Sequence, residues 1–260
     1  MRTLLIDGDI DAYKVAARVE TTIDWGDGVV AKSANSEDAK KQIDTMYRRL
    51  KKMFMADRMI ICLSDDTNFR KTILPSYKSN RKNVIKPALL AELKKYMHES
   101  YEVFKRPTLE ADDVLGILAT VGDVPGLITG DRIVVSEDKD LKSIPGMLFN
   151  PRHPERGTVA IMTWQADLEH MRQTLTGDST DGYSGCPGIG KGKVDKILTK
   201  KHADQTLWEL VVAAYVKKGL TEKDALVQAR VARILRAEDY DFINKRPILW
   251  MPPSQKKAAA

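Results

Sequence analysis

The sequence has few of the residues on which small secreted domains and zinc proteins depend. Only two cysteines, Cys62 and Cys186, occur among 260 residues, which is too few for a disulfide framework and favours a reducing, cytosolic setting. The four histidines form no HExxH motif and none stands beside a CxxC motif, so a His/Cys zinc site is not expected. No run of 18 apolar residues occurs, and the opening MRTLLIDGD is too short in apolar residues for a signal peptide. We therefore expect a protein that is neither secreted by that route nor membrane-spanning.

The composition is that of an ordinary globular protein with an excess of positive charge. Hydrophobic residues make up 43% and charged residues 30% of a chain long enough for one large domain or two closely associated ones. The net charge of +6 favours a polyanionic partner, but many basic proteins bind no nucleic acid. The overall charge alone leaves that question open.

Short apolar runs alternate with longer amphipathic segments along the first half of the chain. The apolar runs are rich in β-branched residues and predict buried parallel strands at 3–7, 59–64 and 132–140. The amphipathic segments predict helices at 36–56, 87–100 and 110–121. A hairpin is expected at 148–164, and helices are expected beyond it at 165–174, 191–198, 205–217 and 222–236. This order indicates an α/β domain with a largely parallel sheet, then a helical region and a disordered tail at 251–260.

Acidic side chains follow all three predicted strands, at Asp7, at Asp65 and at the pair Asp138 and Asp140. Ligands bind beyond the carboxyl ends of parallel strands, so these acids are expected to converge at one edge of the sheet. The other acids of interest, which lie on one helix and in one glycine-rich turn, are Glu110, Asp112, Asp113, Asp178 and Asp181. The alternative is that all of these acids are helix caps and solvated loop residues, because helix N-termini also favour acids.

So many carboxylates in one pocket cannot all ionise without compensating charge. Hard divalent cations prefer oxygen ligands, so Mg²⁺ or Mn²⁺ suits this set. Two ions ~4 Å apart would activate water and stabilise the leaving oxygen of an in-line displacement. A calcium loop beginning at Asp7 fits badly, because Ala12 stands where that loop needs glycine and Arg18 where it needs glutamate.

The segment NFRKTILPSYKSNRK, residues 68–82, mixes basic and aromatic side chains. Aromatic rings can stack on bases while lysine and arginine contact phosphates, as in proteins that bind single strands. A solvated basic loop is the alternative, but the position of the segment after a predicted strand and its terminal acid favours a role in binding. The residues that carry this prediction are Arg70, Tyr77, Lys78 and Arg81.

The segment SGCPGIGKGK, residues 184–193, has the spacing of a phosphate-binding P-loop but not its context. Gly192 stands where Ser or Thr should be, and the polar turn TGDSTDGY precedes it in place of a buried strand. The segment instead predicts a tight turn at Gly188, Ile189 and Gly190 that enters a helix, as in a helix-hairpin-helix DNA-binding element. Backbone N–H groups at a helix N-terminus can approach a phosphate closely there, and Lys191 and Lys193 add charge. A purely structural turn is the alternative.

Five motifs occur in order: LLIDGD, SDDTNFRK…YKSNR, LEADDVLG, SEDKDLKSIPG and GDSTDGYSGCPGIGKGK. In these motifs and their order, the chain resembles the 5′-nuclease (flap endonuclease) superfamily over residues 3 to about 200. Its later segments resemble the 5′→3′ exonucleases of short-tailed bacteriophages to about residue 250. The resemblance implies a PIN-like nuclease domain at 1–162, with a mostly parallel sheet, flanking helices and a helical arch at about 78–108. It also implies a helical region at 163–250 that contains a helix-hairpin-helix at about 177–199.

The resemblance implies a role for each of these residues. The implied ligands of two Mg²⁺ ions, for which Mn²⁺ could substitute, are Asp7, Asp65, Glu110, Asp112, Asp113, Asp138, Asp140, Asp178 and Asp181. Within this set, Asp140, Asp178 and Asp181 would serve the second ion, and Asp66 competes with Asp65 for its role. Lys78 and Arg81 would contact the scissile phosphate as catalytic residues. The implied DNA-binding residues are Arg70, Tyr77, Lys78, Arg81, Gly188, Ile189, Gly190, Lys191 and Lys193, and in relatives the hairpin often also holds K⁺.

The sequence therefore predicts a Mg²⁺-dependent 5′→3′ exodeoxyribonuclease that releases 5′-phosphorylated nucleotides from duplex DNA. Action on 5′ flaps and on RNA–DNA hybrids would suit primer removal in phage DNA replication and recombination, in the cytoplasm of the infected cell and beside phage replication proteins. The short interval from Arg81 to Glu110 favours exonucleolysis over flap threading. The alternatives are a structure-specific flap endonuclease, a non-catalytic DNA-binding protein on the same scaffold, and a PIN-type ribonuclease, which would not need the helix-hairpin-helix.

Overall fold

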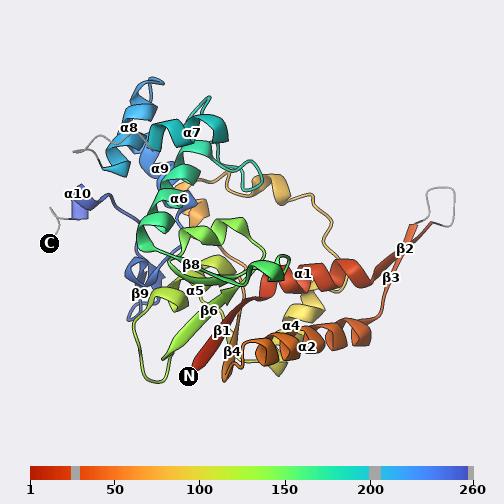
Figure 1. Cartoon of the computed structure of the whole chain (residues 1–260). Helices are drawn as coiled ribbons and strands as arrows, with labels where there is room; N and C mark the ends of the chain where they lie inside the picture. The colour runs from red at the N-terminus through yellow and green to blue at the C-terminus, as the bar shows by residue number, and fades with distance from the viewer. Residues whose placement is uncertain (25–29, 199–205, 257–260) are drawn as a thin grey trace.

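A six-stranded sheet forms the centre of the protein in the computed structural model, which describes residues 1–24, 30–198 and 206–256 (Figure 1). The strands lie in the order β5-β4-β1-β6-β7-β8. Their bounds are Val103–Phe104, Arg58–Cys62, Arg2–Asp7, Asp131–Val135, Gly146–Phe149 and Thr158–Ile161. Every neighbouring pair is parallel except β7 and β8, which form the predicted hairpin. The mostly parallel α/β fold predicted from the sequence is thus confirmed.

Helices cover both faces of this sheet because alternate residues of the central strands point in opposite directions. On one face Leu5 and Val134 pack against α5 (Ala111–Thr120). On the other face Leu4 and Ile6 pack against three helices, α1 (Gly8–Val19), α2 (Ser36–Met53) and α4 (Leu90–Ser100). Since both faces are buried, the central strands read as continuous apolar runs, which is why the sequence revealed them.

The sequence assigned no element to residues 8–35, where the structure has α1 and a projecting hairpin. The hairpin pairs β2 (Glu20–Asp24) with β3 (Val30–Ala34) and extends away from the body of the molecule (Figure 1). Helix α1 follows β1 without a loop. Gly8 permits this, because a Cβ there would lie 2.5 Å from the Ile61 side chain and 3.0 Å from the carbonyl oxygen of Cys62.

The predicted arch, residues 78–108, contains a single helical turn near its start and the helix α4 further along. The chain between them has little regular secondary structure. The single turn η1 (Ser79–Arg81) follows the short helix α3 (Arg70–Ile73). Residues 84–87 have no regular secondary structure and lead to α4, and β5 lies near the end of the segment. Pro87 disfavours helical geometry in the residue before it, which is consistent with the absence of helix there. Figure 1 shows this strap, residues 82–89, crossing between the helical top of the molecule and α4.

The C-terminal helices build a separate apolar core. Their bounds are α6 Thr163–Thr176, α7 Lys191–Leu198, α8 Leu207–Val216 and α9 Glu222–Ala232. Leu175, Val194, Val211 and Ala229 pack together in this core. The chain then returns to the sheet, where Ile234 and Leu235 join the core around α5. The division into domains at 162/163 stays a prediction, because this return packs the two regions against each other.

Helix α9 ends at Ala232, four residues before the predicted position, because Arg233 is extended and the chain turns toward α5. The single turn η4 (Ala237–Asp239) and a two-stranded ribbon of β9 (Tyr240–Asp241) and β10 (Arg246–Pro247) follow. The disorder expected at 251–260 stays a prediction, and the structure describes residues 251–256 of this tail. There Pro252 is buried, α10 spans Pro253–Lys256, and the Gln255 amide donates to Glu222. Residues 257–260 lie outside the described part of the chain.

None of the helices in the described ranges is long and apolar enough to cross a membrane.

Candidate active site

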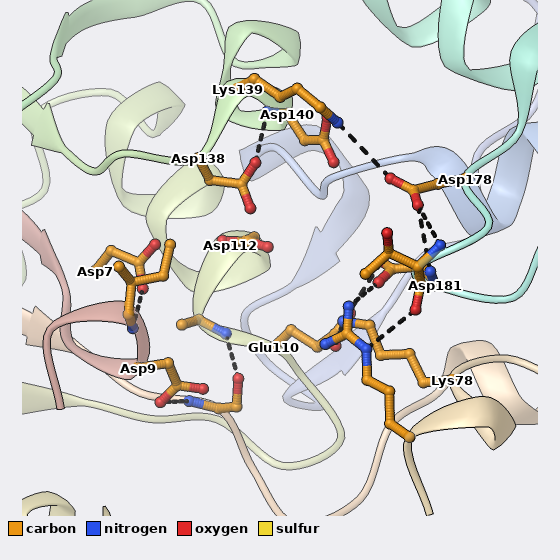
Figure 2. A pocket seen from close by; sticks show the side chains of 15 residues that line it. Asp7, Asp9, Lys78, Glu110, Asp112, Asp138, Lys139, Asp140, Asp178 and Asp181 are labelled. Atoms are coloured by element: carbon orange, nitrogen blue, oxygen red, sulfur yellow. Dashed lines mark hydrogen bonds and ion pairs between the residues drawn. The ribbon is translucent and has the colours of Figure 1, made fainter. Parts of the chain in front are cut away.

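A cavity of about 350 Å³ opens at the carboxyl edge of the sheet, lined by residues of both regions. Seven of the nine predicted ligands line it: Asp7, Glu110, Asp112, Asp138, Asp140, Asp178 and Asp181. Figure 2 shows their side chains around a common space, with Asp112 near the middle and Asp178 and Asp181 on the side opposite Asp7. Lys78, Arg81 and Lys139 supply positive charge to the same cavity.

Ser136 ties together the acids that follow β1 and β6. Its hydroxyl donates to Asp7 at 2.7 Å and accepts from the backbone N–H of Asp138 at 3.0 Å. Asp138 in turn accepts from the backbone N–H of Asp140 at 2.8 Å, and the Gln173 amide of α6 donates to Asp140 at 3.1 Å. These contacts fix three carboxylates at the ends of two adjacent strands.

Burial and mutual repulsion disfavour ionisation of several of these carboxyls. Burial raises the pKa of Asp7 to about 7, although the hydrogen bond from Ser136 opposes the shift. Burial also raises the pKa of Asp112 well above its usual range, and the charges of Asp7 and Asp138 add to this effect. The pKa of Asp140 is raised by burial and by Asp138. A positive charge within the cavity would therefore stabilise the ionised forms.

The residues just before the strap bind two acids that line the cavity, Glu110 and Asp181. The Tyr77 hydroxyl lies 2.9 Å from Glu110 and 3.0 Å from Asp181 and shares its single hydrogen between these two carboxylates. Lys78 forms an ion pair with Glu110, and Arg81 forms one with Asp181. Burial alone would raise the pKa of Glu110, but the charges of Arg70 and Lys78 outweigh it and bring that pKa down to about 2. Glu110 is thus an anion that cations already surround.

Asp113 is fully buried and does not line the cavity. It accepts a hydrogen bond from each terminal nitrogen of Arg70 at 2.7 Å, and others from the backbone N–H groups of Glu110 and Leu235 at 3.1 Å. Its oxygens are therefore directed at partners within the protein. This placement does not support the role of a metal ligand that the resemblance implied.

Asp65 also lies outside the cavity. It accepts from the Thr67 hydroxyl at 2.7 Å and from the backbone N–H of Thr108 at 2.9 Å, and it lies 3.3 Å from Lys105. Its competitor Asp66 is 98% exposed, and its carboxylate lies 3.4 Å from the Lys105 ammonium. The loop that follows β4 thus turns both acids away from the common space.

Arg70 and Tyr77 are buried, which does not support their predicted contacts with DNA. Besides Asp113 and Glu110, the Arg70 guanidinium donates to the carbonyl oxygens of Val231 at 2.9 Å and Arg233 at 2.6 Å. The Tyr77 ring packs with Tyr183 and Val231, so its faces are not open to a base. Both side chains hold the strap base to the rest of the protein.

The glycine turn lies in a shallow pocket at the start of α7, lined by Ser184, Cys186 and residues 188–193. Gly188 has a φ of +73°, which a residue with a side chain rarely adopts. The Ile189 side chain is buried in the C-terminal core, whereas Gly190, Lys191 and Lys193 are exposed. Gly190 and Lys191 are thus open to a ligand at a helix N-terminus, while the Lys193 ammonium donates to the Gly188 carbonyl oxygen at 3.0 Å. The role of this turn in DNA binding stays a prediction.

Sequence reasoning missed several residues that line or support the cavity. Asp9 was given no role, yet it lines the cavity, accepts from the backbone N–H of Ser64 at 3.3 Å and pairs with Lys94 of α4 at 2.8 Å. Its position two residues after Asp7, within the motif LLIDGD, could have indicated that Asp9 belongs to the same site. Ser136 stands directly before the acidic run EDKD, but nothing in the sequence revealed that its hydroxyl reaches Asp7.

The donor set fits a hard divalent cation in its chemistry. All the acidic side chains of the cavity offer carboxylate oxygens, the ligands that Mg²⁺ and Mn²⁺ prefer. As the side chains stand, no three acids, histidines or cysteines in the described ranges are close enough together to hold an ion. Small side-chain movements toward the common space would be needed, which the ion pairs of Glu110 and Asp181 now oppose.

The family model for the 5′-3′ exonuclease N-terminal resolvase-like domain matches residues 2–147. The chain belongs to this 5′-3′ exonuclease family. As a member it is a nuclease. It is similar to the exodeoxyribonuclease of Enterobacteria phage T3, at 30% identity over 96% of this chain and 93% of the relative. Similarity to the exonuclease of Escherichia phage T7 has the same identity and coverage.

A solved structure of the phage T5 D15 protein, co-crystallised with metal ions, shares the fold. Its TM-score is 0.63 at 14% sequence identity, with 89% of each chain covered. The PIN-like fold implied by the resemblance is thus confirmed for this member of the family.

Proposed function

We propose that the protein is a Mg²⁺-dependent 5′→3′ exodeoxyribonuclease that removes 5′-phosphorylated nucleotides from the 5′ ends of duplex DNA. One observation carries the proposal: carboxylates from both regions of the chain meet in a single cavity, with Lys78 and Arg81 at the same place. Family membership and the name of the T3 relative support DNA as the substrate. Metal ions in the T5 structure support a dependence on metal ions.

The acids of the cavity divide into two groups that could each hold one ion. Asp7, Glu110, Asp112 and Asp138 would hold the first, and Asp140, Asp178 and Asp181 the second. Asp65 and Asp113 would only position the surrounding chain, because their oxygens bind other groups. When bound, the two ions supply a nucleophile from water at neutral pH and stabilise charge on the leaving oxygen. Mn²⁺ would substitute for Mg²⁺, since both accept oxygen ligands.

Lys78 and Arg81 would bind the scissile phosphate from the strap side. To do so they must exchange Glu110 and Asp181 for phosphate oxygens, which arginine can contact with two parallel N–H groups. This exchange would break both ion pairs, leaving Glu110 in contact with Tyr77 and Arg70, and Asp181 in contact with Tyr77. The exposed turn with Gly188, Gly190, Lys191 and Lys193 would grip the duplex backbone, and its carbonyl groups could also hold K⁺.

The same site would act on 5′ flaps and on RNA paired with DNA, and so serve primer removal beside phage replication proteins in the infected cell. A structure-specific flap endonuclease is the second candidate, because a strap crosses above the sheet edge and could enclose a single strand (Figure 1). A ribonuclease or a non-catalytic DNA-binding protein would have less use for this combination of acids and exposed lysines.

The first experiment uses a duplex labelled at one 5′ end, beside a 5′-flap substrate of the same sequence, each with Mg²⁺ and with EDTA. We expect mononucleotides from the duplex in Mg²⁺ only. Cutting confined to the flap junction would establish the endonuclease instead. Binding of both substrates without any cleavage would establish a non-catalytic protein.

Two variants test the site within the same assay. Asp138→Ala should lower the rate by on the order of 10³-fold or more, because ligands of the ions supply several kcal/mol of transition-state stabilisation. DNA affinity in EDTA should persist. Asp66→Ala is the matched control, since this exposed acid follows β4 of the same sheet but lies outside the cavity. Wild-type turnover by Asp138→Ala would refute the assignment of the site.

A further inference from the structure

A second hollow, of about 680 Å³, lies between α1, α2 and the chain that follows β7. We call it the α1–α2 groove; it shares no lining residue with the acidic cavity. Its floor is apolar, built by the buried side chains of Val15, Leu50 and Phe149. Met53, which is 57% exposed, and half-buried Met46 line the same groove. Methionine adapts its shape to different apolar partners, so this floor suits a bound apolar side chain.

The rim of the groove is cationic. Arg18 of α1 and Lys41 and Arg49 of α2 line it and are exposed. None of the three forms an ion pair with a side chain in the described part of the protein, whereas the neighbouring Lys40 pairs with Glu37 and Glu92. Asp38 is the one acid among the described residues that line the groove. Unpaired cations around an apolar floor present a surface complementary to an acidic ligand with apolar side chains.

We infer that the α1–α2 groove binds an acidic peptide segment of a partner protein, with large apolar side chains entering the groove and carboxylates meeting its rim. A nucleic-acid backbone would use the three cations but would leave the exposed Met53 side chain and the apolar floor beneath it without a partner. Peptides that bind in grooves use both components, since apolar side chains give affinity and charges guide the encounter. Because the groove is separate from the acidic cavity, binding there would recruit the nuclease without blocking it.

The test uses a fluorescein-labelled peptide, Asp-Asp-Glu-Leu-Asp-Asp-Phe-Leu, and the full chain, with fluorescence anisotropy as the readout. We expect saturable binding that weakens as salt is added. Binding should fall about tenfold in the double variant K41E/R49E, because two favourable charge contacts become repulsive. Met53→Asp should weaken binding similarly, and a peptide with serine in place of its leucines and phenylalanine should not bind. Both variants should keep wild-type cleavage of the 5′-labelled duplex.

The matched control is K51E/K52E, which reverses two exposed charges of the same helix outside the groove. It should bind the peptide like the wild type. Three results would overturn the inference: no saturable binding of the peptide to the wild type, an equal loss in K51E/K52E, or binding that Met53→Asp leaves unchanged. If duplex DNA displaces the peptide and K41E/R49E weakens duplex binding tenfold, the groove is instead part of the nucleic-acid surface.

Discussion

Replacing Arg70 by methionine separates a structural role of this side chain from a role in DNA binding. The Arg70 guanidinium and the Asp113 carboxylate form a fully buried ion pair with two 2.7 Å hydrogen bonds. Removing one member of such a pair leaves an uncompensated buried charge, which costs ~3–5 kcal/mol. Natural domains are stable by about 5–15 kcal/mol, so the variant should lose a large part of its free energy of unfolding.

The assay is urea unfolding followed by circular dichroism, with the denaturant slope checked for constancy. Arg81→Met is the control, because the Arg81 side chain is 45% exposed and its ion pair should contribute less than about 1 kcal/mol. The double variant R70M/D113L should recover much of the loss, since well-packed apolar residues often replace a buried ion pair at little cost.

Duplex binding in EDTA completes this test. R70M, where it remains folded, should bind DNA like the wild type, whereas Arg81→Met should bind less tightly. The reasoning would be refuted by an R70M protein that is within 1 kcal/mol of wild-type stability and has lost as much DNA affinity as Arg81→Met. Arg70 would then reach DNA by leaving Asp113.

Three further predictions concern Ser136 at the cavity, Asp11 of α1 and the glycine turn. Ser136→Ala should lower the apparent affinity for Mg²⁺ or the cleavage rate by roughly 10–100-fold, because the hydroxyl orients Asp7, and unchanged Mg²⁺ titrations would contradict this. Burial and then Asp7 raise the pKa of Asp11 to about 8, above its ordinary 3.8, so the folded protein holds a proton that the unfolded chain has lost. Stability should therefore fall as the pH rises from about 4 to about 8, and Asp11→Asn should flatten this slope in urea titrations at pH 5–8. K191E/K193E should weaken duplex binding and reduce its logarithmic salt dependence by about 2, an effect that K51E/K52E should not show.

The acids at the strand ends were predictable because parallel strands deliver their carboxyl ends to one edge of a sheet. Asp7, Asp138 and Asp140 needed only the recognition of β1 and β6 as buried runs. Asp178 and Asp181 are far from these acids in the sequence. Their placement in the same site was predicted from the resemblance that the five ordered motifs carry.

The division of labour between Asp112 and Asp113 was not visible in the sequence. Both acids lie in the first turn of α5, where either could face a site. Arg70 decides the matter by pairing with Asp113, and this contact spans 43 positions in the chain. Asp65 is similar, because its orientation depends on the distant backbone N–H of Thr108.

Helix α1 was missed because its sequence, GDIDAYKVAARV, begins with a glycine and two acids, as turns often do. Its buried face consists mainly of Ala12, Val15 and Ala16, which give a weak apolar pattern. Small side chains on this face let the helix pack closely against the sheet. The sequence alone does not show that a sheet lies there.

The return of the chain after α9 has a consequence for the protein during its synthesis. The carbonyl oxygens of Val231 and Arg233 accept from Arg70, and the N–H of Leu235 donates to Asp113. Residues 231–235 thus support Arg70, which in turn contacts Glu110 in the cavity. Translation delivers the first 181 residues, with every carboxylate of the site, before this support exists. A nascent chain that has reached Asp181 therefore carries the chemical groups of a nuclease without their scaffold, and cleavage activity should appear only once residues 231–235 have emerged from the ribosome and packed against Arg70 and Asp113.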